Sequence, residues 1–485
     1  MPWRVAPGNA SVPAIPAIDG ASDLAPASDE VEHKPDPDSL ASSNSDNDTP
    51  RTDKDPWAQA SQPLPSSSPA TDPDRELDRI GIPNGGLRAW LVVVGAFIDF
   101  MVALGLLNSF GIFQARYEAK WPDRSTATLT WIGSTQLFVL FAGGLFVGPA
   151  FDKYGSRTLM LLGTGCCLAS FLCTSWSTNY WHFLLSQGFL FGLGNALLFY
   201  PVTGAVSEWF DKSRGLALGI AAAGSSVGGV FWPIILSSLF DTMLEETVHR
   251  IVAVISTPLL LLSCLLVKER KEAAGHDTSG NQVQPSQSSA SKAIFEWRFL
   301  ALSVCLMILY CGVLIPFYYV PLYALDHGVN RSMANNLLAV TYAGSFFGRI
   351  GAGWLADRLG RFNILFLMGT LMSVVTFCWI WMTSLGAMIA FSVLFGLFSG
   401  GLVPLGPACV AQTTHDMGHI GLRIGVMMVF SSAGALSGGP LSGILRDGPT
   451  GWLAVHSFSA GVALAGALLL LGVRIWHRPY ALAKF

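Results

Sequence analysis

The amino-acid sequence predicts an all-α membrane protein, a bundle of about twelve helices arranged as two six-helix halves with pseudo-two-fold symmetry. Three observations lead to this prediction. Of the 485 residues, 51% are hydrophobic and only 13% are charged. From Arg88 onward, apolar segments alternate with short polar breaks. A short loop that contains glycine and aspartate occurs twice, at the same position in each half.

The low charge content indicates that lipid surrounds most of the chain. A soluble domain of this length has roughly a quarter of its residues charged, whereas the mean hydropathy here is +0.47. The net charge of −3 combines two unlike regions, because residues 1–80 contain fifteen acidic and six basic residues. An acidic tail on an apolar, weakly basic body is typical of a polytopic protein with a cytosolic extension. We therefore expect the lipid bilayer, and not nucleic acid, around the body.

The composition divides the chain into five regions. Residues 1–83 are rich in Pro, Ser, Asp and Ala, which predicts a disordered cytosolic tail. The polar stretch 268–297 is the predicted cytosolic linker between two six-helix halves, 84–267 and 298–475. Residues 476–485 form a second predicted cytosolic tail.

Each apolar segment is about 20 residues long, which at about 1.5 Å per residue matches a hydrocarbon core of roughly 30 Å. Lipid offers no hydrogen-bond partners to the backbone, so we expect these segments to be helices. The predicted spans are 88–113, 128–150, 157–176, 180–204, 214–239, 250–267, 299–323, 332–356, 363–383, 386–411, 422–445 and 452–474. About eighteen Lys and Arg lie on the side of both termini and about six on the other. The positive-inside rule therefore places both termini in the cytosol, and we expect the plasma membrane, with the vacuolar membrane as the alternative.

Two loops share the pattern G-x-x-x-D-x-x-G at an offset of 205 residues. The positions are Gly148, Asp152 and Gly155, followed by Arg157, and Gly353, Asp357 and Gly360, followed by Arg361. The glycines permit a tight turn, and the aspartate is expected to cap the incoming helix and to pair with a basic neighbour. A repeated six-helix unit suits transporters that rock one half against the other. The loops are therefore predicted to be conformational gates, the alternative being ordinary charged hairpins.

These features together resemble the major facilitator superfamily, and two stretches narrow the resemblance to the fungal branch of its monocarboxylate-porter family. Residues 84–90 (NGGLRAW) look like the family's first-helix motif, with Asn84 where the acid usually stands. Residues 209–224 (WFDKSRGLALGIAAAG) match the family's motif at the start of the fifth helix, except at Trp209 and Ser213. The resemblance covers about 84–475 and implies a solute transporter with no covalent chemistry.

Two ionisable residues stand out deep inside predicted spans, where charge is costly and tends to face an interior cavity. Arg349 is in the eighth predicted helix, and its planar set of donors suits a carboxylate. The resemblance implies that Arg349 binds solute; the alternative is an arginine that reaches the cytosolic interface or holds a neighbouring helix. Asp99, midway along the first predicted helix, is a candidate proton carrier or a structural hydrogen-bonding group.

Two positions depart from the proton-coupled members of the family. Ser345 stands where the resemblance implies an aspartate, and Asn108 where it implies a lysine. These departures argue against lactate-type symport and favour a larger, more aromatic or hydroxylated solute. The expected lining of its cavity consists of Asn108, Asn195, Tyr200, Tyr310, Tyr318, Tyr319, Tyr342 and Ser345.

The sequence favours a secondary active transporter that moves a small organic acid or secondary metabolite by alternating access, in the direction of efflux. The chain has no P-loop to bind ATP, and its eight cysteines lie in apolar runs without a C-x-x-C pair. We therefore expect no enzymatic activity, cofactor or metal, and protons are the candidate coupling ion. The alternatives are a monocarboxylate or riboflavin-type uptake porter and, in another class, a non-transporting nutrient sensor.

Overall fold

The structure, a computed structural model, describes residues 85–124, 126–270, 296–414, 419–446 and 448–477. The predicted tail 1–83, the predicted linker from residue 271 to 295 and the last eight residues lie outside the described residues. The disorder expected of these segments therefore stays a prediction.

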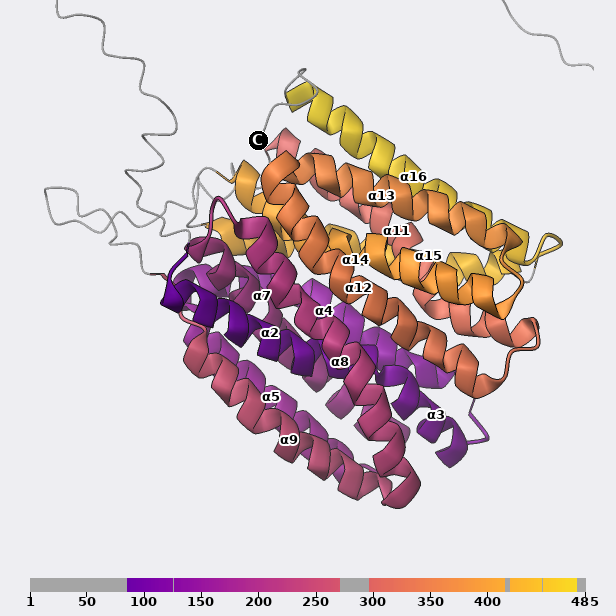
Figure 1. Cartoon of the computed structure of the whole chain (residues 1–485). Helices are drawn as coiled ribbons and strands as arrows, with labels where there is room; N and C mark the ends of the chain where they lie inside the picture. Colours follow the sequence, from indigo (N-terminus) through magenta and orange to yellow (C-terminus); the bar gives the residue numbers. More distant parts are fainter. Residues whose placement is uncertain (1–84, 125, 271–295, 415–418, 447, 478–485) are drawn as a thin grey trace, which may run out of the picture. The chain divides into compact units, whose positions relative to one another are not determined.

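Six helical rods form the first half of the bundle (Figure 1). They are α2 (Leu87–Asn108) with its continuation α3 (Phe110–Lys120), α4 (Thr126–Tyr154), α5 (Ser156–Ser175), the composite of α6 (Tyr180–Phe183), a π-helical turn (Leu184–Leu190) and α7 (Phe191–Trp209), then α8 (Arg214–Thr242) and α9 (Glu245–Leu266). The first predicted span is broken at Ser109, whose hydroxyl donates to the carbonyl of Gly105 at 2.7 Å. A side chain that bonds the backbone of the preceding turn commonly accompanies such a helix bend.

Six further rods form the second half, so the described residues confirm the predicted twelve-helix, all-α fold (Figure 1). They are α11 (Trp297–Asp326), α12 (Arg331–Leu359), α13 (Arg361–Cys378) with a 3₁₀ turn (Trp379–Trp381), α14 (Leu385–Thr413), α15 (Ile420–Arg446) and α16 (Trp452–His477). Eleven of the rods in the described residues are long and apolar enough to cross a membrane. The twelfth, α12, is the more polar helix that contains Ser345 and Arg349, and it packs against α8 and α14.

Helix packing repeats between the halves, which gives the pseudo-two-fold symmetry. In each half the first rod packs against the fifth, as α2 against α8 and α11 against α15. The sixth rod packs against the first and the third, as α9 against α2 and α5 and α16 against α11 and α13. Between the halves the second rod of one packs against the fifth of the other, as α4 against α15 and α12 against α8. These two contacts form the seam.

Glycine brings the helix backbones together at both seam contacts. A Cβ atom built on Gly353 of α12 would lie 2.2 Å from the carbonyl oxygen of Gly215 on α8. A Cβ on Gly148 of α4 would lie 2.2 Å from the carbonyl oxygen of Gly421 on α15. Close backbone approach at small residues is a main source of helix association where lipid removes the hydrophobic drive. The seam therefore depends on glycine at these positions.

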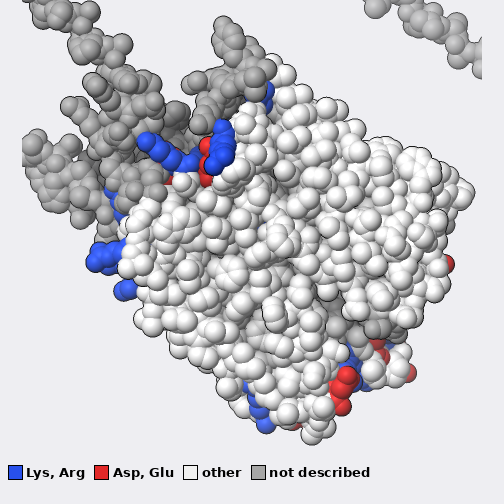
Figure 2. Space-filling view, in the orientation of Figure 1, with Lys and Arg blue, Asp and Glu red and all other residues white. Residues whose placement is uncertain are grey.

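Charged side chains gather at the two ends of the face shown in Figure 2, and a broad band without charge separates them. We call the end that contains Asp152 and Asp357 the proximal end, and the other the distal end. At the distal end Arg116 pairs with Asp241 at 2.9 Å and Lys120 with Glu245 at 3.1 Å. These basic residues belong to the side that the positive-inside rule expects to be poor in Lys and Arg. Their acidic partners offset that charge locally.

The close contact between α8 and α12 predicts that substitutions at two glycines of α12 differ in their effect on thermal stability. Gly353→Val places methyl groups against the α8 backbone, and such overpacking typically costs about 1–3 kcal/mol. We expect the melting temperature of the purified protein in detergent to fall by several degrees. Gly351→Val is the matched control, because a Cβ at Gly351 meets no atom within 4 Å. Equal melting temperatures for the two variants would contradict a tight α8–α12 contact.

Candidate solute path and gate

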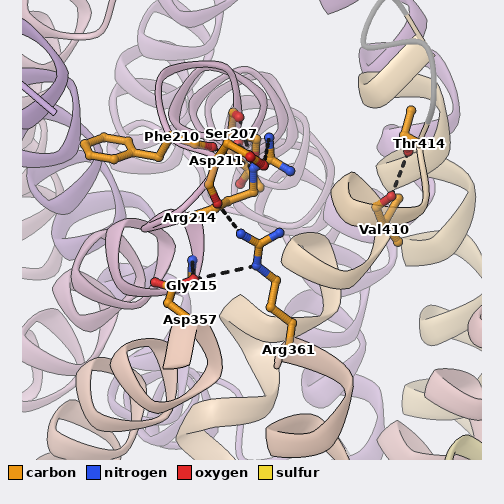
Figure 3. A network of polar contacts seen from close by, with 10 residues as sticks. Ser207, Phe210, Asp211, Arg214, Gly215, Asp357, Arg361, Val410 and Thr414 are labelled. Carbon is orange, nitrogen blue, oxygen red and sulfur yellow. Dashed lines mark hydrogen bonds and ion pairs between the residues drawn. The ribbon is translucent and has the colours of Figure 1, made fainter. Parts of the chain in front are cut away.

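The carboxylate of Asp357, near the end of α12, binds the start of α8 in the opposite half (Figure 3). Its Oδ1 accepts a hydrogen bond from the backbone N–H of Gly215 at 2.9 Å, and its Oδ2 from that of Leu216 at 2.7 Å. The first N–H groups of a helix have no partner within the helix and form the positive end of its dipole. Asp357 therefore caps a helix that belongs to the other half.

Two arginines hold the turn that leads into α8. Arg361, the first residue of α13, has its Nε 3.6 Å from Asp357 Oδ1, and its Nη2 donates to the carbonyl of Asp211 in the other half (Figure 3). Arg214 is buried, and its Nε donates to the carbonyls of Ser207 at 3.1 Å and Phe210 at 2.8 Å. The turn is thus fixed from both sides of the seam.

The carboxylate of Asp152 makes the equivalent contact at the other seam. Its Oδ1 and Oδ2 each accept at 3.0 Å, from the backbone N–H groups of Gly421 and Leu422 at the start of α15. The next residue, Arg423, donates to Glu296 Oε2 at 2.7 Å and to the carbonyl of Thr413 at 3.1 Å. The two copies of the duplicated loop therefore join the halves at the proximal end through two symmetry-related contacts.

The capped helices differ from the ones expected from the sequence. The aspartates were expected to cap the helices that follow their own loops, α5 and α13. Instead each carboxylate bonds the fifth rod of the opposite half, because the glycines at the seam bring that helix start within hydrogen-bond distance. The expected pairing with a basic neighbour is present for Asp357 and Arg361, whereas Arg157 is exposed on α5.

Arg349 lies across the seam near the middle of α12. The residue is 6% exposed, and its Nη1 donates to the carbonyl of Ala222 and the hydroxyl of Ser225, both on α8. Its Nε has no hydrogen-bond acceptor among the described residues. Arg349 therefore holds the neighbouring helix, as one sequence interpretation expected, and retains one donor that the described residues leave unused.

Two tyrosines of the second half, Tyr310 of α11 and Tyr342 of α12, lie near Arg349. Tyr318 of α11 lies near Tyr342, and its side chain is exposed. The ring of Tyr342 reaches the other half, because a Cβ on Gly229 of α8 would lie 2.9 Å from it. A guanidinium with phenol groups around it suits a planar anion that carries an aromatic ring.

The other predicted lining residues lie on several helices of both halves. Asn195 and Tyr200, both on α7, bond within the first half, to the carbonyls of Phe191 at 2.9 Å and Phe141 at 3.0 Å. Ser345 faces α14, since a Cβ on Gly400 would lie 2.6 Å from its hydroxyl. Asn108 is half-buried at the end of α2, and Tyr319 donates to the carbonyl of Gly439 at 3.1 Å.

Asp99 is fully buried inside the first half and does not belong to the seam contacts described above. Its carboxyl group on α2 lies near the thiols of Cys167 on α5 and Cys264 on α9. Neither carboxylate oxygen has a hydrogen-bond donor among the described residues.

Sequence reasoning did not identify several residues of the proximal contacts. Asp211, Glu296 and Gly421 take part in them, yet each lies in a stretch that reads as an ordinary polar turn or helix start. The one available signal was the fifth-helix motif at 209–224, which contains Arg214 and Gly215.

The family model for the Major Facilitator Superfamily matches residues 89–387 and 302–483. The chain belongs to the Major Facilitator Superfamily. The MFS-type transporter pynF of Aspergillus niger is 41% identical over 395 residues, which cover 81% of this chain and 89% of that protein. The agnestins efflux protein of Paecilomyces divaricatus is 36% identical over 398 residues, 82% of this chain and 90% of that one. The aspyridones efflux protein apdF of Emericella nidulans is 34% identical over 415 residues, which cover 85% of this chain and 81% of that protein.

Solved structures of Major Facilitator Superfamily proteins share the fold. The E. coli fucose:proton symporter FucP aligns with a TM-score of 0.62 at 18% identity, over 80% of this chain and 98% of that chain. The human organic anion transporter MFSD10 aligns with a TM-score of 0.60 at 16% identity, over 80% of this chain and 100% of that chain. This superfamily member is therefore an integral, multi-pass membrane transporter of small molecules and not an enzyme.

Removing the charge of Asp357 tests the proximal contact. Asp357→Asn leaves a side chain of the same shape but weakens the interactions with the α8 N-terminus and with Arg361, which together are expected to contribute about 1–2 kcal/mol. We expect a clear fall in melting temperature in detergent. Asp123→Asn, in an exposed turn at the distal end, is the control and should melt like the wild type. A loss no larger than that of the control would contradict a stabilising contact.

Proposed function

We propose that this transporter exports a fungal secondary metabolite that carries an acidic group beside an aromatic or hydroxylated ring. The observation that carries the proposal is Arg349 at the seam, buried, with an Nε that has no acceptor among the described residues and with Tyr310 and Tyr342 nearby. Efflux, as the proposed direction, is supported by the names of three relatives, the agnestins, aspyridones and fujikurins efflux proteins. The departures at Asn108 and Ser345 support a solute other than lactate within a monocarboxylate-porter-like branch.

The seam supports alternating access as the mechanism. The contacts of Asp152 and Asp357 join the halves at the proximal end, and both must break before solute passes between the halves there. An anion bound by Arg349 would compete for the donors that hold Ala222 and Ser225 of α8. Solute binding would thereby loosen one seam contact near mid-membrane and favour rearrangement of the halves.

The proposal includes the placement of the protein in the cell. We infer that the proximal end and both termini face the cytosol and that the protein lies in the plasma membrane, where export leaves the cell. The Lys and Arg count supports this orientation, and the paired acids at the distal end account for the basic residues found on the other side.

The role of Arg349 is tested in a fungal strain that lacks the gene. Metabolite profiling of cells and medium should show an acidic aromatic compound retained in the deletion strain and released again when the wild-type gene is restored. Arg349→Ala, at equal protein abundance, should lower release about tenfold or more, because hydrogen bonds to a charged group contribute about 1.5–3 kcal/mol. Release by Arg349→Lys should lie between that of the wild type and that of Arg349→Ala, since lysine keeps the charge and loses the planar donors.

Three results, from this experiment and from uptake and proteoliposome assays, would redirect the assignment. Normal release by Arg349→Ala would remove the arginine from the solute site. Failure of the deletion strain to take up an acid or riboflavin from the medium would favour an uptake porter. Binding of the compound without counterflow in proteoliposomes would favour a non-transporting sensor.

We infer that Asp99 is the residue that couples transport to protons. Support comes from its complete burial and its lack of a donor among the described residues, because ionisable groups at membrane depth commonly mark proton relays. Asp99→Asn should abolish proteoliposome uptake driven by a pH gradient and leave counterflow of the same compound at equal pH within about twofold of wild type. Equal loss of both activities would assign Asp99 a structural role instead.

A further inference from the structure

A short segment after α9 crosses the proximal ends of α7 and α5. Three consecutive residues each bond to the first half. Trp209 Nε1 donates to the carbonyl of Lys268 at 2.6 Å, and the backbone N–H of Arg270 donates to Glu208 Oε2 at 3.0 Å. Between them, Glu269 Oε2 accepts from the backbone N–H of Ser156 at 2.7 Å. The segment 268–270 is thus fastened at three points.

Glu269 supplies the cap that α5 lacks in its own sequence. The residue before the helix is Gly155, which has no side chain to bond the first N–H groups. Its φ of +79° favours glycine, and a Cβ built there would lie 2.0 Å from Glu269 Oε2. Glycine at this position therefore allows both the turn and the approach of a carboxylate from 113 residues further along the chain. A carboxylate at a helix N-terminus is favourable for both hydrogen bonding and the dipole.

The capped turn is the one that positions Asp152. Helix α4 ends at Tyr154, and the backbone N–H of Gly155 bonds to the carbonyl of Phe151 at 2.9 Å. Asp152 lies in this last turn of α4 and reaches across the seam to Gly421 and Leu422. A displacement at Ser156 therefore moves the backbone that holds the carboxylate of Asp152.

The duplicated loop in the second half is supported differently. There Arg361, the first residue of α13, pairs with Asp357 within the loop itself and bonds Asp211 across the seam. In the first half the basic residue of the pattern, Arg157, is exposed. In the first half the carboxylate of Glu269 bonds the residue that follows the loop, Ser156.

We propose that Glu269 is a positioning residue for the proximal gate: it holds the first turn of α5 and thereby keeps Asp152 in register with the start of α15. The proposal rests on the proposed role of the Asp152 loop as a gate. In addition, segment 268–270, where the chain leaves the first half, stabilises that gate. Release of this segment would weaken the contact of Asp152 with the start of α15, although the segment itself does not bond α15.

Amide hydrogen exchange of the full-length protein in nanodiscs tests this coupling. Glu269→Ala should raise exchange in the first turn of α5 about threefold or more, as loss of an N-cap does. Exchange should also rise about threefold at the start of α15, around Gly421 and Leu422, whose N–H groups bond Asp152. Glu269→Gln should show smaller rises, because it keeps an acceptor oxygen and loses the charge. Glu246→Ala, an exposed residue that pairs with Arg250 on α9, is the control and should change neither region.

Asp152→Asn separates failure of this proposal from failure of the gate. That variant should raise exchange at the start of α15 and leave the first turn of α5 unchanged. If Glu269→Ala affects α5 alone while Asp152→Asn affects α15, Glu269 is a local cap and the positioning role is overturned. If Asp152→Asn leaves α15 unchanged as well, the gate itself is overturned.

Discussion

Two carboxylates, Asp152 and Asp357, each bind the backbone N–H groups at the start of a helix in the opposite half. The start of a helix always presents N–H groups that the helix itself cannot satisfy. Here the partner comes from across the seam, so satisfying the backbone at the ends of α8 and α15 joins the two halves. Separation of the halves at this end exposes both helix starts and both carboxylates. Water is available there to replace the lost bonds, which keeps the contacts reversible.

The remaining seam contacts follow from this constraint. For an aspartate to reach a helix start, the two helices must lie backbone to backbone, and glycine at Gly148, Gly215, Gly353 and Gly421 permits that approach. Further along α12 the same proximity brings Arg349 to the carbonyl of Ala222 and the hydroxyl of Ser225. One helix pair, α8 and α12, therefore carries both the Asp357 cap and the Arg349 contact, and the two residues lie about two turns apart on α12.

The sequence could predict the fold because its signals are local. Apolar segment length defines the spans, and the repeat of Gly148–Gly155 at Gly353–Gly360 identifies both the duplication and its two loops. The direction in which a side chain points depends on packing between distant segments, and the sequence does not encode it locally. Asn195 and Tyr200, for example, bond to carbonyls of the first half that no local feature of the sequence indicates. Glu269 was missed for the same reason, since its partner Ser156 is 113 residues away.

Distances between spin labels at both ends of the seam test most directly whether the halves move against each other. One pair would use the exposed positions Thr158 and Leu359 at the proximal end, and the other Leu244 and Met333 at the distal end. The exposed cysteines Cys173 and Cys378 would be replaced by serine. If the halves rock, each label pair should show two populations of distances. The fraction of molecules with the short proximal distance should equal the fraction with the long distal distance. The double variant Asp152→Asn/Asp357→Asn should reduce both fractions together. A single distance in both pairs, or lengthening at both ends at once, would contradict alternating access built on these caps.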